Sequence, residues 1–354
     1  MTNKTRICFV APISSKNLGG ISSWISIVKD NMPDNYESFF IDTSLRHSFS
    51  KKRTFFDKYI YSLFRVFEQK KNLKKMILHE KIDILHIATS GGFGFYRDLQ
   101  LLKIAKANNV KTILHFHFGR IPALISSKKG LEYQLFLKCL EYSDFLISID
   151  KNTFECLNSN GITSYYVPNP TILHSNLYSS NSKNILFVGH VTPEKGIFEL
   201  INSFSAFSKN FPDWKLFIVG PCQKRIKKAI ERKCSLNGVT FFGPVSHEEV
   251  ISFMHDSSFL VLPSYTEGMP NAILEAMSCG LPCIGTSVGN MPEMLKDTGI
   301  IVPPKSVTAL NDALSRMATD KQLMGRLSSA SYERIIKEYV PSVVIQKMIE
   351  VWEK

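Results

Sequence analysis

Short apolar runs alternate with longer stretches of helical periodicity along the whole chain. The apolar runs of the first half end near Ile13, Ile41, Ala88, Phe118, Ile149 and Val167. Those of the second half span 185–188, 216–219, 239–242, 259–262, 282–285 and 300–302. Helical patterns lie between most of them, for example the apolar residues at positions 197, 200, 201, 204 and 207. Because strands and helices alternate, the pattern predicts an α/β protein built from βαβ units with parallel sheets.

The chain length and one linker-like stretch divide this pattern in two. The chain has 354 residues, and a typical domain has roughly 150. Pro168-Asn169-Pro170 and the Ser/Asn-rich stretch 175–184 have little to bury, which is typical of a linker. We therefore predict domains at 1–170 and 171–340, followed by a C-terminal helix at 341–354 after a break at Pro341.

Composition agrees with two ordinary globular cores. Hydrophobic residues make up 44% of the chain and charged residues 21%. The apolar runs are far shorter than the roughly 20 residues that a membrane-spanning helix needs, and the N-terminus has no pattern of a signal peptide. The 7 cysteines are scattered and odd in number, which indicates reduced thiols of a cytoplasmic protein rather than disulfides or a zinc site.

The positive charge is concentrated in the first half of the chain. The net charge is +12, and residues 1–170 hold 24 basic against 14 acidic residues. Residues 51–75 alone hold 9 basic and 2 acidic residues, interleaved with aromatic and aliphatic side chains at helical spacing. This pattern is compatible with a basic amphipathic helix that binds an anionic membrane surface. A core-packed helix with a solvated basic face is equally compatible, and no nucleic-acid-binding motif is present nearby.

Candidate chemistry should follow the strands, because ligands of parallel α/β sheets lie beyond the strands' carboxyl ends. Gly19 and Gly20 precede a helical pattern, where backbone N–H groups can bind an anion, although a plain turn explains them as well. His115 and His117 end a strand that begins at Lys111 and share one face of it. His117 lies nearer the strand end and is the better site candidate, the alternative being a structural histidine. Arg120 can meet a phosphate or be a solvated loop residue.

Two segments of the second half carry charged residues at strand ends. His190 and Lys195 follow the run at 185–188 and precede a helix, so a lysine charge and the helix dipole act on the same anion. Taken alone, Lys195 is better explained as a surface lysine, and only its neighbours favour a binding role. The stretch 264–277 is more specific: a strand ends, a loop contains Gly268, and Pro270 begins a helix. Its two glutamates, Glu267 in the loop and Glu275 in the helix, are expected to accept hydrogen bonds from a ligand rather than being simply solvated.

The residues at 264–288 resemble the signature of the large family-4, or group 1, retaining glycosyltransferases, with glutamates eight positions apart. The resemblance extends to the Gly19–Gly20 loop, His117, the segment 188–196, Gly289 and Pro292-Glu293. It implies the GT-B fold, in which two Rossmann-like domains face each other across a cleft and the C-terminal helices pack back toward the N-terminal domain. It also implies an acceptor on the N-terminal domain and a nucleotide-sugar donor on the C-terminal one.

The resemblance assigns roles to individual residues. Lys195 matches the family's phosphate-binding lysine, Glu275 its ribose-binding glutamate, Glu267 its sugar-contacting glutamate and His117 its donor-sugar histidine. The expected catalytic residues are His117, Lys195 and Glu267. The expected donor-binding residues are Gly19, Gly20, His190, Lys195, Glu267, Gly268, Met269, Pro270, Asn271 and Glu275.

One departure from the family concerns the diphosphate. Many members have arginine where this chain has His190, and a neutral imidazole does not replace a bidentate guanidinium. Lys195 and the loop N–H groups must then suffice, or another cation such as Arg120 must compensate. No Asp-x-Asp triplet occurs, in agreement with a reaction that needs neither metal nor cofactor.

The sequence thus predicts an enzyme that transfers a hexosyl or N-acetylhexosaminyl group with retention, from a UDP-sugar in preference to a GDP-sugar. The acceptor is expected to be a glycan or lipid-linked molecule of bacterial cell-surface polysaccharide or glycolipid synthesis. The expected location is the cytoplasm, with peripheral attachment to the inner face of the membrane. Alternatives are a GT-B-like epimerase or phosphorylase, or a basic nucleic-acid-binding protein, although no nucleic-acid partner is expected.

Overall fold

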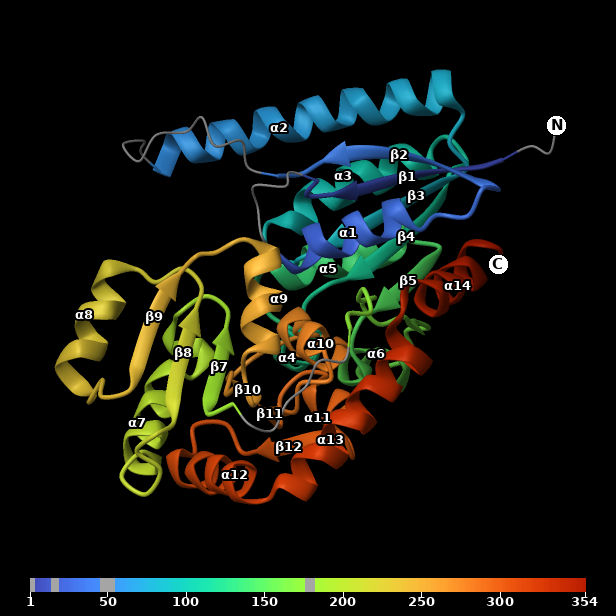
Figure 1. Cartoon of the computed structure of the whole chain (residues 1–354). Helices are drawn as coiled ribbons and strands as arrows, with labels where there is room; N and C mark the ends of the chain where they lie inside the picture. The colour runs from blue at the N-terminus through green and yellow to red at the C-terminus, as the bar shows by residue number, and fades with distance from the viewer. Residues whose placement is uncertain (1–3, 14–18, 45–54, 176–181) are drawn as a thin grey trace. The chain divides into compact units, whose positions relative to one another are not determined.

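A computed structural model describes residues 4–13, 19–44, 55–175 and 182–354, and the side chains of 55–62 are not described. The chain forms two compact units (Figure 1). Unit 1 comprises Met1–Pro170 together with Val344–Lys354, and unit 2 comprises Thr171–Val343. The N-terminal boundary of unit 2 therefore lies between Pro170 and Thr171.

Unit 1 contains a six-stranded parallel sheet in the order β2-β1-β3-β4-β5-β6. Its strands are β1 (Thr5–Ala11), β2 (Tyr36–Asp42), β3 (Ile84–Thr89), β4 (Lys111–Phe116), β5 (Phe145–Ser148) and β6 (Tyr165–Tyr166). Strands buried on both faces read as apolar runs, which is why the sequence pattern located all six.

Helices cover both faces of this sheet. They are α1 (Gly20–Asp30), α2 (Phe55–Lys75) with its π-helical continuation η1 (Met76–Glu80), α3 (Gly94–Lys106), α4 (Ile121–Ser127), α5 (Gly130–Glu141), α6 (Lys151–Ser159) and α14 (Pro341–Trp352). Alternate strand residues face opposite cores. Cys8 and Val10 pack with α3 and α5, whereas Ile7 and Phe9 pack with α1 and α14.

The C-terminal helix α14 completes the core of unit 1. It contributes six buried residues, among them Met348 and Trp352, the latter only 2% exposed. Burial of several large apolar side chains stabilises by roughly 1.5–3 kcal/mol each. The expectation that the end of the chain packs back onto the N-terminal domain is therefore confirmed.

Unit 2 has a second six-stranded parallel sheet, in the order β12-β11-β10-β7-β8-β9. Its strands are β7 (Asn184–Val188), β8 (Lys215–Val219), β9 (Val239–Gly243), β10 (Phe259–Leu262), β11 (Cys283–Thr286) and β12 (Gly299–Val302). Its helices are η2 (Pro193–Lys195), α7 (Ile197–Phe207), α8 (Lys224–Lys233), α9 (His247–His255), α10 (Asn271–Ser278), α11 (Met291–Met294), α12 (Val307–Thr319), α13 (Lys321–Arg334) and η3 (Ile335–Tyr339).

Two helix starts differ from the sequence expectation. Pro270 was expected to begin a helix, but it is the N-cap with extended backbone, and α10 begins at Asn271. Gly19 and Gly20 were expected to precede a helix, but α1 begins at Gly20 itself, with Gly19 as the N-cap. Helix ends are defined by backbone angles rather than by apolar periodicity, so the periodicity places them only to within a residue or two.

Gly196 joins η2 to α7 at a point where a side chain does not fit. Its φ is +70°, and a Cβ there would lie 2.0 Å from the carbonyl oxygen of Pro263, just beyond β10. The glycine therefore lets the segment after β7 approach the segment after β10 closely.

Gly196→Ala is expected to lower the free energy of unfolding by about 2–4 kcal/mol, because it combines left-handed strain with a backbone clash. Gly325→Ala is the matched control: Gly325 lies in α13 with open space around it, and alanine there should stabilise by up to about 1 kcal/mol. Urea unfolding measures both. Equal stabilities for the two variants would contradict the close packing at Gly196.

Candidate functional site

The segment after β7 presents Lys195 at the carboxyl edge of the unit 2 sheet. Val191 forms a parallel bridge with Cys222, and its N–H donates to the Pro221 carbonyl at 3.0 Å. Lys195 closes the 3-10 turn η2, and the Tyr265 N–H donates to the Glu194 carbonyl at 2.8 Å. The turn is thereby tied to the loop that follows β10.

Lys195 and Glu267 form an ion pair in this place. The Lys195 Nζ donates to the Glu267 Oε1, and the Ser264 hydroxyl donates to the same oxygen at 2.7 Å. The Glu267 side chain is only 11% exposed, whereas that of Lys195 is 29% exposed. Partial burial weakens the solvent screening of the pair, yet the lysine remains open to an incoming anion.

Backbone contacts fix the loop that carries Glu267. The Asn290 N–H donates to the Gly268 carbonyl at 2.7 Å, and the Thr286 hydroxyl donates to the Ser264 carbonyl at 2.6 Å. Gly289 has a φ of +56°, and a Cβ there would lie 2.4 Å from the Glu267 carbonyl oxygen. The loop after β11 thus supports the glutamate from behind.

Glu275 lies on α10, which begins directly after this loop. Its side chain is half-buried, and burial raises the pKa of Glu275 to about 7. A desolvated carboxylate gains from hydrogen-bond donors of a ligand. Among the residues that the structure describes, none forms an ion pair or side-chain hydrogen bond with this carboxylate.

The remaining donor-site candidates of unit 2 lie along the same two loops. Met269 and Pro270 are buried, and Asn271 is the first residue of α10. His190 is exposed, two residues past the end of β7. Unit 2 therefore brings Lys195, Ser264 and Glu267 into direct contact, whereas His190 and Glu275 are not linked to them by a recorded hydrogen bond.

The candidates of unit 1 lie at the carboxyl edge of the first sheet. Gly19 and Gly20 start α1. His117 follows β4, and its N–H donates to the Thr89 carbonyl at 2.9 Å. Its ring centroid lies 4.2 Å from that of His115 and 4.7 Å from that of Trp24, in keeping with the shared face expected for the two histidines.

His117 has an unusual polar environment. Both ring nitrogens are buried and have no hydrogen-bond partner among the described residues. Burial, together with the nearby His86, lowers the pKa of His117 to about 3, so the imidazole is neutral at pH 7. Buried polar atoms without partners are uncommon and often mark a ligand-binding or catalytic group.

Arg120 is occupied within unit 1. It pairs with Glu132 at 3.3 Å, and its guanidinium lies 5.4 Å from the centre of the Phe118 ring. Glu132 also accepts the Gly92 N–H at 2.8 Å. Arg120 therefore supports the loops after β3 and β4.

The sequence did not single out Trp24, which packs against His117, or His86 and Trp352, which lie next in the same aromatic cluster. His86 contacts both Trp24 and Trp352. One signal was available, because His86 interrupts the apolar run of a strand buried on both faces. The two tryptophans carry no such local signal.

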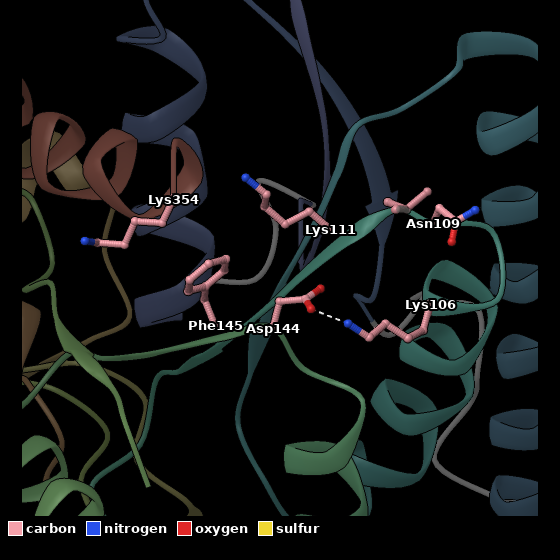
Figure 2. Close-up of a pocket in the computed structure, with 7 residues that line it drawn as sticks. Lys106, Asn109, Lys111, Asp144, Phe145 and Lys354 are labelled. Atoms are coloured by element: carbon pink, nitrogen blue, oxygen red, sulfur yellow. Dashed lines mark hydrogen bonds and ion pairs between the residues drawn. The ribbon is translucent and has the colours of Figure 1, made fainter.

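A pocket of about 550 Å³ lies at the opposite, amino-terminal edge of the unit 1 sheet (Figure 2). Three of its lining residues are lysines, but Lys106 pairs with Asp144 and the Lys111 Nζ donates to the Trp352 carbonyl at 2.7 Å. These interactions attach the end of α14 to the sheet, so the pocket is explained by packing.

The described parts of the chain contain no group of three or more His, Cys, Asp or Glu side chains that could hold a metal ion. No described helix is both long and apolar enough to cross a bilayer.

Comparison with known proteins agrees with this geometry. A family model described as glycosyl transferases group 1 matches residues 170–334. An uncharacterized glycosyltransferase of Haemophilus influenzae is 27% identical over 293 residues, which cover 80% of this chain and 78% of that protein. TuaC of Bacillus subtilis, a glycosyltransferase assigned to teichuronic acid biosynthesis, is 27% identical over 155 residues, 44% of this chain and 38% of TuaC.

The fold also matches a solved structure over its full length. Anabaena HepE in complex with UDP superposes with a TM-score of 0.75 at 15% identity, covering 99% of this chain and 100% of HepE. Two parallel six-stranded sheets and this match confirm the GT-B fold. The chain thus has the GT-B fold, and its residues 170–334 are similar to the group 1 glycosyltransferases.

Proposed function

We propose that the chain transfers a hexosyl or N-acetylhexosaminyl group from a UDP-sugar to a hydroxyl of an acceptor, with retention of configuration and without a metal ion. The observation that carries the proposal is the Lys195–Glu267 pair with Ser264 at the carboxyl edge of the unit 2 sheet. A cation for the diphosphate and a carboxylate for sugar hydroxyls stand side by side there. HepE, which shares the fold, was crystallised with UDP, and this favours a UDP-sugar.

Each residue then has a distinct task. Lys195 leaves Glu267 for the donor diphosphate, and Glu267 accepts hydrogen bonds from the transferred sugar. Backbone N–H groups at the start of α10 face the same phosphates, where the helix dipole favours negative charge. Glu275 accepts hydrogen bonds from the ribose diol, and His117 of unit 1 contacts the sugar.

The rate of transfer depends on how well the negative charge of the leaving diphosphate is stabilised. As the bond between sugar and diphosphate breaks, negative charge grows on the leaving oxygen, and Lys195 with the α10 N-terminus stabilises it. These groups supply what a metal ion supplies in other transferases. Retention rests on the resemblance of the 264–288 signature to the retaining family.

The acceptor is proposed to be a glycan or lipid-linked molecule of cell-surface polysaccharide or glycolipid synthesis in the bacterial cytoplasm. TuaC, assigned to teichuronic acid biosynthesis, supports this class. The alternative enzymes are a GT-B-like epimerase, which would act on the nucleotide-sugar alone, and a phosphorylase, which would cleave a glycan with inorganic phosphate.

The test of this function is a donor panel. Purified protein is incubated with UDP-, GDP- and ADP-sugars in EDTA, with and without glycan acceptors, and products are followed by NMR. We expect UDP release from one UDP-sugar and a product with the donor's anomeric configuration. Release that requires Mg²⁺ or Mn²⁺ would contradict the metal-free mechanism, and an epimerised donor would favour the alternative.

Substitutions of the two members of the ion pair are expected to change the affinity for UDP in opposite directions. Lys195→Ala should weaken UDP binding by roughly 10–100-fold, the value of a charged hydrogen bond. Glu267→Gln should strengthen UDP binding by a few-fold, because Lys195 no longer has a competing carboxylate, while transfer is lost. Calorimetry with UDP measures both. Weaker UDP binding by Glu267→Gln would contradict the proposed exchange of partners.

Glu275 makes donor affinity depend on pH. Only the ionised carboxylate accepts both ribose hydrogen bonds, and its pKa is about 7. Affinity for an intact UDP-sugar should therefore fall about tenfold between pH 8 and pH 6, since roughly one site in eleven is ionised at pH 6. Calorimetry at both pH values measures it, and a pH-independent wild-type affinity would contradict the assignment.

Glu275→Gln is the control for that pH dependence. Its donor affinity should be low and equal at pH 6 and pH 8. Because the folded pKa lies above the ordinary value, ionising Glu275 costs stability as the pH rises toward 7. The variant should consequently have a higher Tm than wild type at pH 8, and the difference should shrink at pH 5.

Helix α2 supports a peripheral membrane location. Phe64 and Phe67 are 62% and 67% exposed, on the side opposite the buried Leu73. Lys71, Lys74 and Lys75 are exposed next to them, whereas Lys51, Lys52 and Arg53 lie outside the described residues. A solvated basic face would not need exposed phenylalanines, so the combination favours anionic lipid.

Replacing Lys71, Lys74 and Lys75 by Gln should weaken binding to anionic liposomes about 100-fold, at roughly 1 kcal/mol per lysine. The matched control replaces Lys224, Lys227 and Lys228 of α8, which are equally exposed, and should bind like wild type. Liposome sedimentation at low salt measures both. An equal loss of liposome binding in the two variants would show that only the net charge of the protein matters. Wild-type protein that does not bind anionic liposomes would refute the membrane location.

A further inference from the structure

A chain of buried hydrogen bonds runs from the C-terminal helix to the neighbourhood of His117. The Trp352 indole Nε1 donates to the Nδ1 of His86 at 3.1 Å, and the Nε2 of His86 lies 3.1 Å from the Nδ1 of His115. All four of these nitrogens belong to residues that are at most 2% exposed. The chain joins α14, β3 and β4, three elements of unit 1.

The first link determines the positions of all the protons. An indole N–H can only donate, so the Nδ1 of His86 must carry a lone pair, and a neutral His86 carries its proton on Nε2. That proton is donated to His115, whose Nδ1 must then be the acceptor. His115 in turn carries its proton on Nε2. Burial lowers the pKa of His86 to about 3 and that of His115 well below its usual range, so both rings are neutral.

This order has a consequence for His117. A neutral imidazole has one lone pair on its ring nitrogens, and that of His115 is occupied by His86. His115 therefore offers no acceptor to His117, although the centroids of the two rings lie only 4.2 Å apart. If the chain ran in the opposite direction, the Nε2 of His115 would carry a lone pair and could capture the N–H of His117.

The chemistry of His117 indicates what it binds. Both of its nitrogens are buried without a partner among the described residues, and the neutral ring offers one donor and one acceptor. A hydroxyl group also donates and accepts, whereas a phosphate diester only accepts. His117 therefore matches a hydroxyl of a sugar better than a phosphate.

We propose that Trp352, through His86 and His115, sets the direction of this hydrogen-bond chain and thereby keeps the His117 N–H available for a substrate hydroxyl. His86, His115 and Trp352 are positioning residues, and His117 alone touches the ligand. The proposal rests on the sugar-contacting role of His117 in the proposed function. Packing alone does not account for the chain, because apolar residues of similar shape would fill a buried core without the cost of desolvating imidazoles.

The proton positions can be observed directly by ¹⁵N NMR of histidine-labelled full-length protein at pH 7.5. We expect wild-type His86 and His115 to carry their protons on Nε2 only. Trp352→Phe removes the indole N–H and keeps an aromatic ring, and it should give mixed or reversed tautomers at both histidines. Trp24→Phe is the matched control, since the Trp24 Nε1 has no recorded partner, and it should leave both tautomers unchanged.

Measurements of transfer activity test whether the hydrogen-bond chain acts through His117. Trp352→Phe should lower kcat/KM for transfer roughly tenfold, the effect of one misdirected hydrogen bond. A wild-type His86 protonated on Nδ1 would overturn the proposal without any variant. Unchanged tautomers in Trp352→Phe, or altered tautomers with unchanged kcat/KM, would overturn it as well.

The proposed function can fail separately. If His117→Ala keeps wild-type kcat/KM, then the sugar-contacting role of His117 is wrong, even though the tautomers of His86 and His115 follow Trp352 as expected. If His117→Ala is impaired but Trp352→Phe is not, then His117 acts in transfer and the positioning chain is refuted.

Discussion

The ion pair between Lys195 and Glu267 is the interaction around which unit 2 is arranged. Two loops from different strands must meet to form it, and backbone contacts rather than long side chains bring them together. Gly196 allows the approach on one side, and Gly289 supports the glutamate loop on the other. In the absence of donor, the pair satisfies two charges that would otherwise be half-buried and uncompensated. In the proposed function the same charges bind the nucleotide-sugar, and donor binding is then an exchange of partners.

Unit 1 holds a neutral imidazole at the edge of its sheet. The C-terminal end of the chain contributes to this arrangement, because α14 packs into the core of unit 1 and Trp352 donates a hydrogen bond to His86. A basic, aromatic helix, α2, lies elsewhere on the same unit. In the proposed function, unit 2 supplies fixed charges for phosphate and ribose, and unit 1 supplies uncharged hydrogen bonds.

The sequence was sufficient for the fold because most strands are buried on both faces and appear as apolar runs, and each of the twelve described strands overlaps a predicted run. The sequence also identified Lys195, Glu267 and Gly268 as candidates, because a strand, a glycine-containing loop and a helix start lie next to each other in the sequence. The aromatic cluster beside His117 could not be predicted in this way. Trp24, His86 and Trp352 are separated by up to 328 positions and come together only in the tertiary fold. Likewise, periodicity could not distinguish a packed face of α2 from an exposed one, because apolar residues occur on both.

The most direct test of the ion-pair exchange is a crystal structure of the protein with UDP or a UDP-sugar bound. The account predicts the Lys195 Nζ within about 3 Å of a phosphate oxygen, with Glu267 turned toward the sugar position and Glu275 on the ribose hydroxyls. A bound donor with the Lys195–Glu267 pair still intact and the diphosphate held by other residues would contradict it.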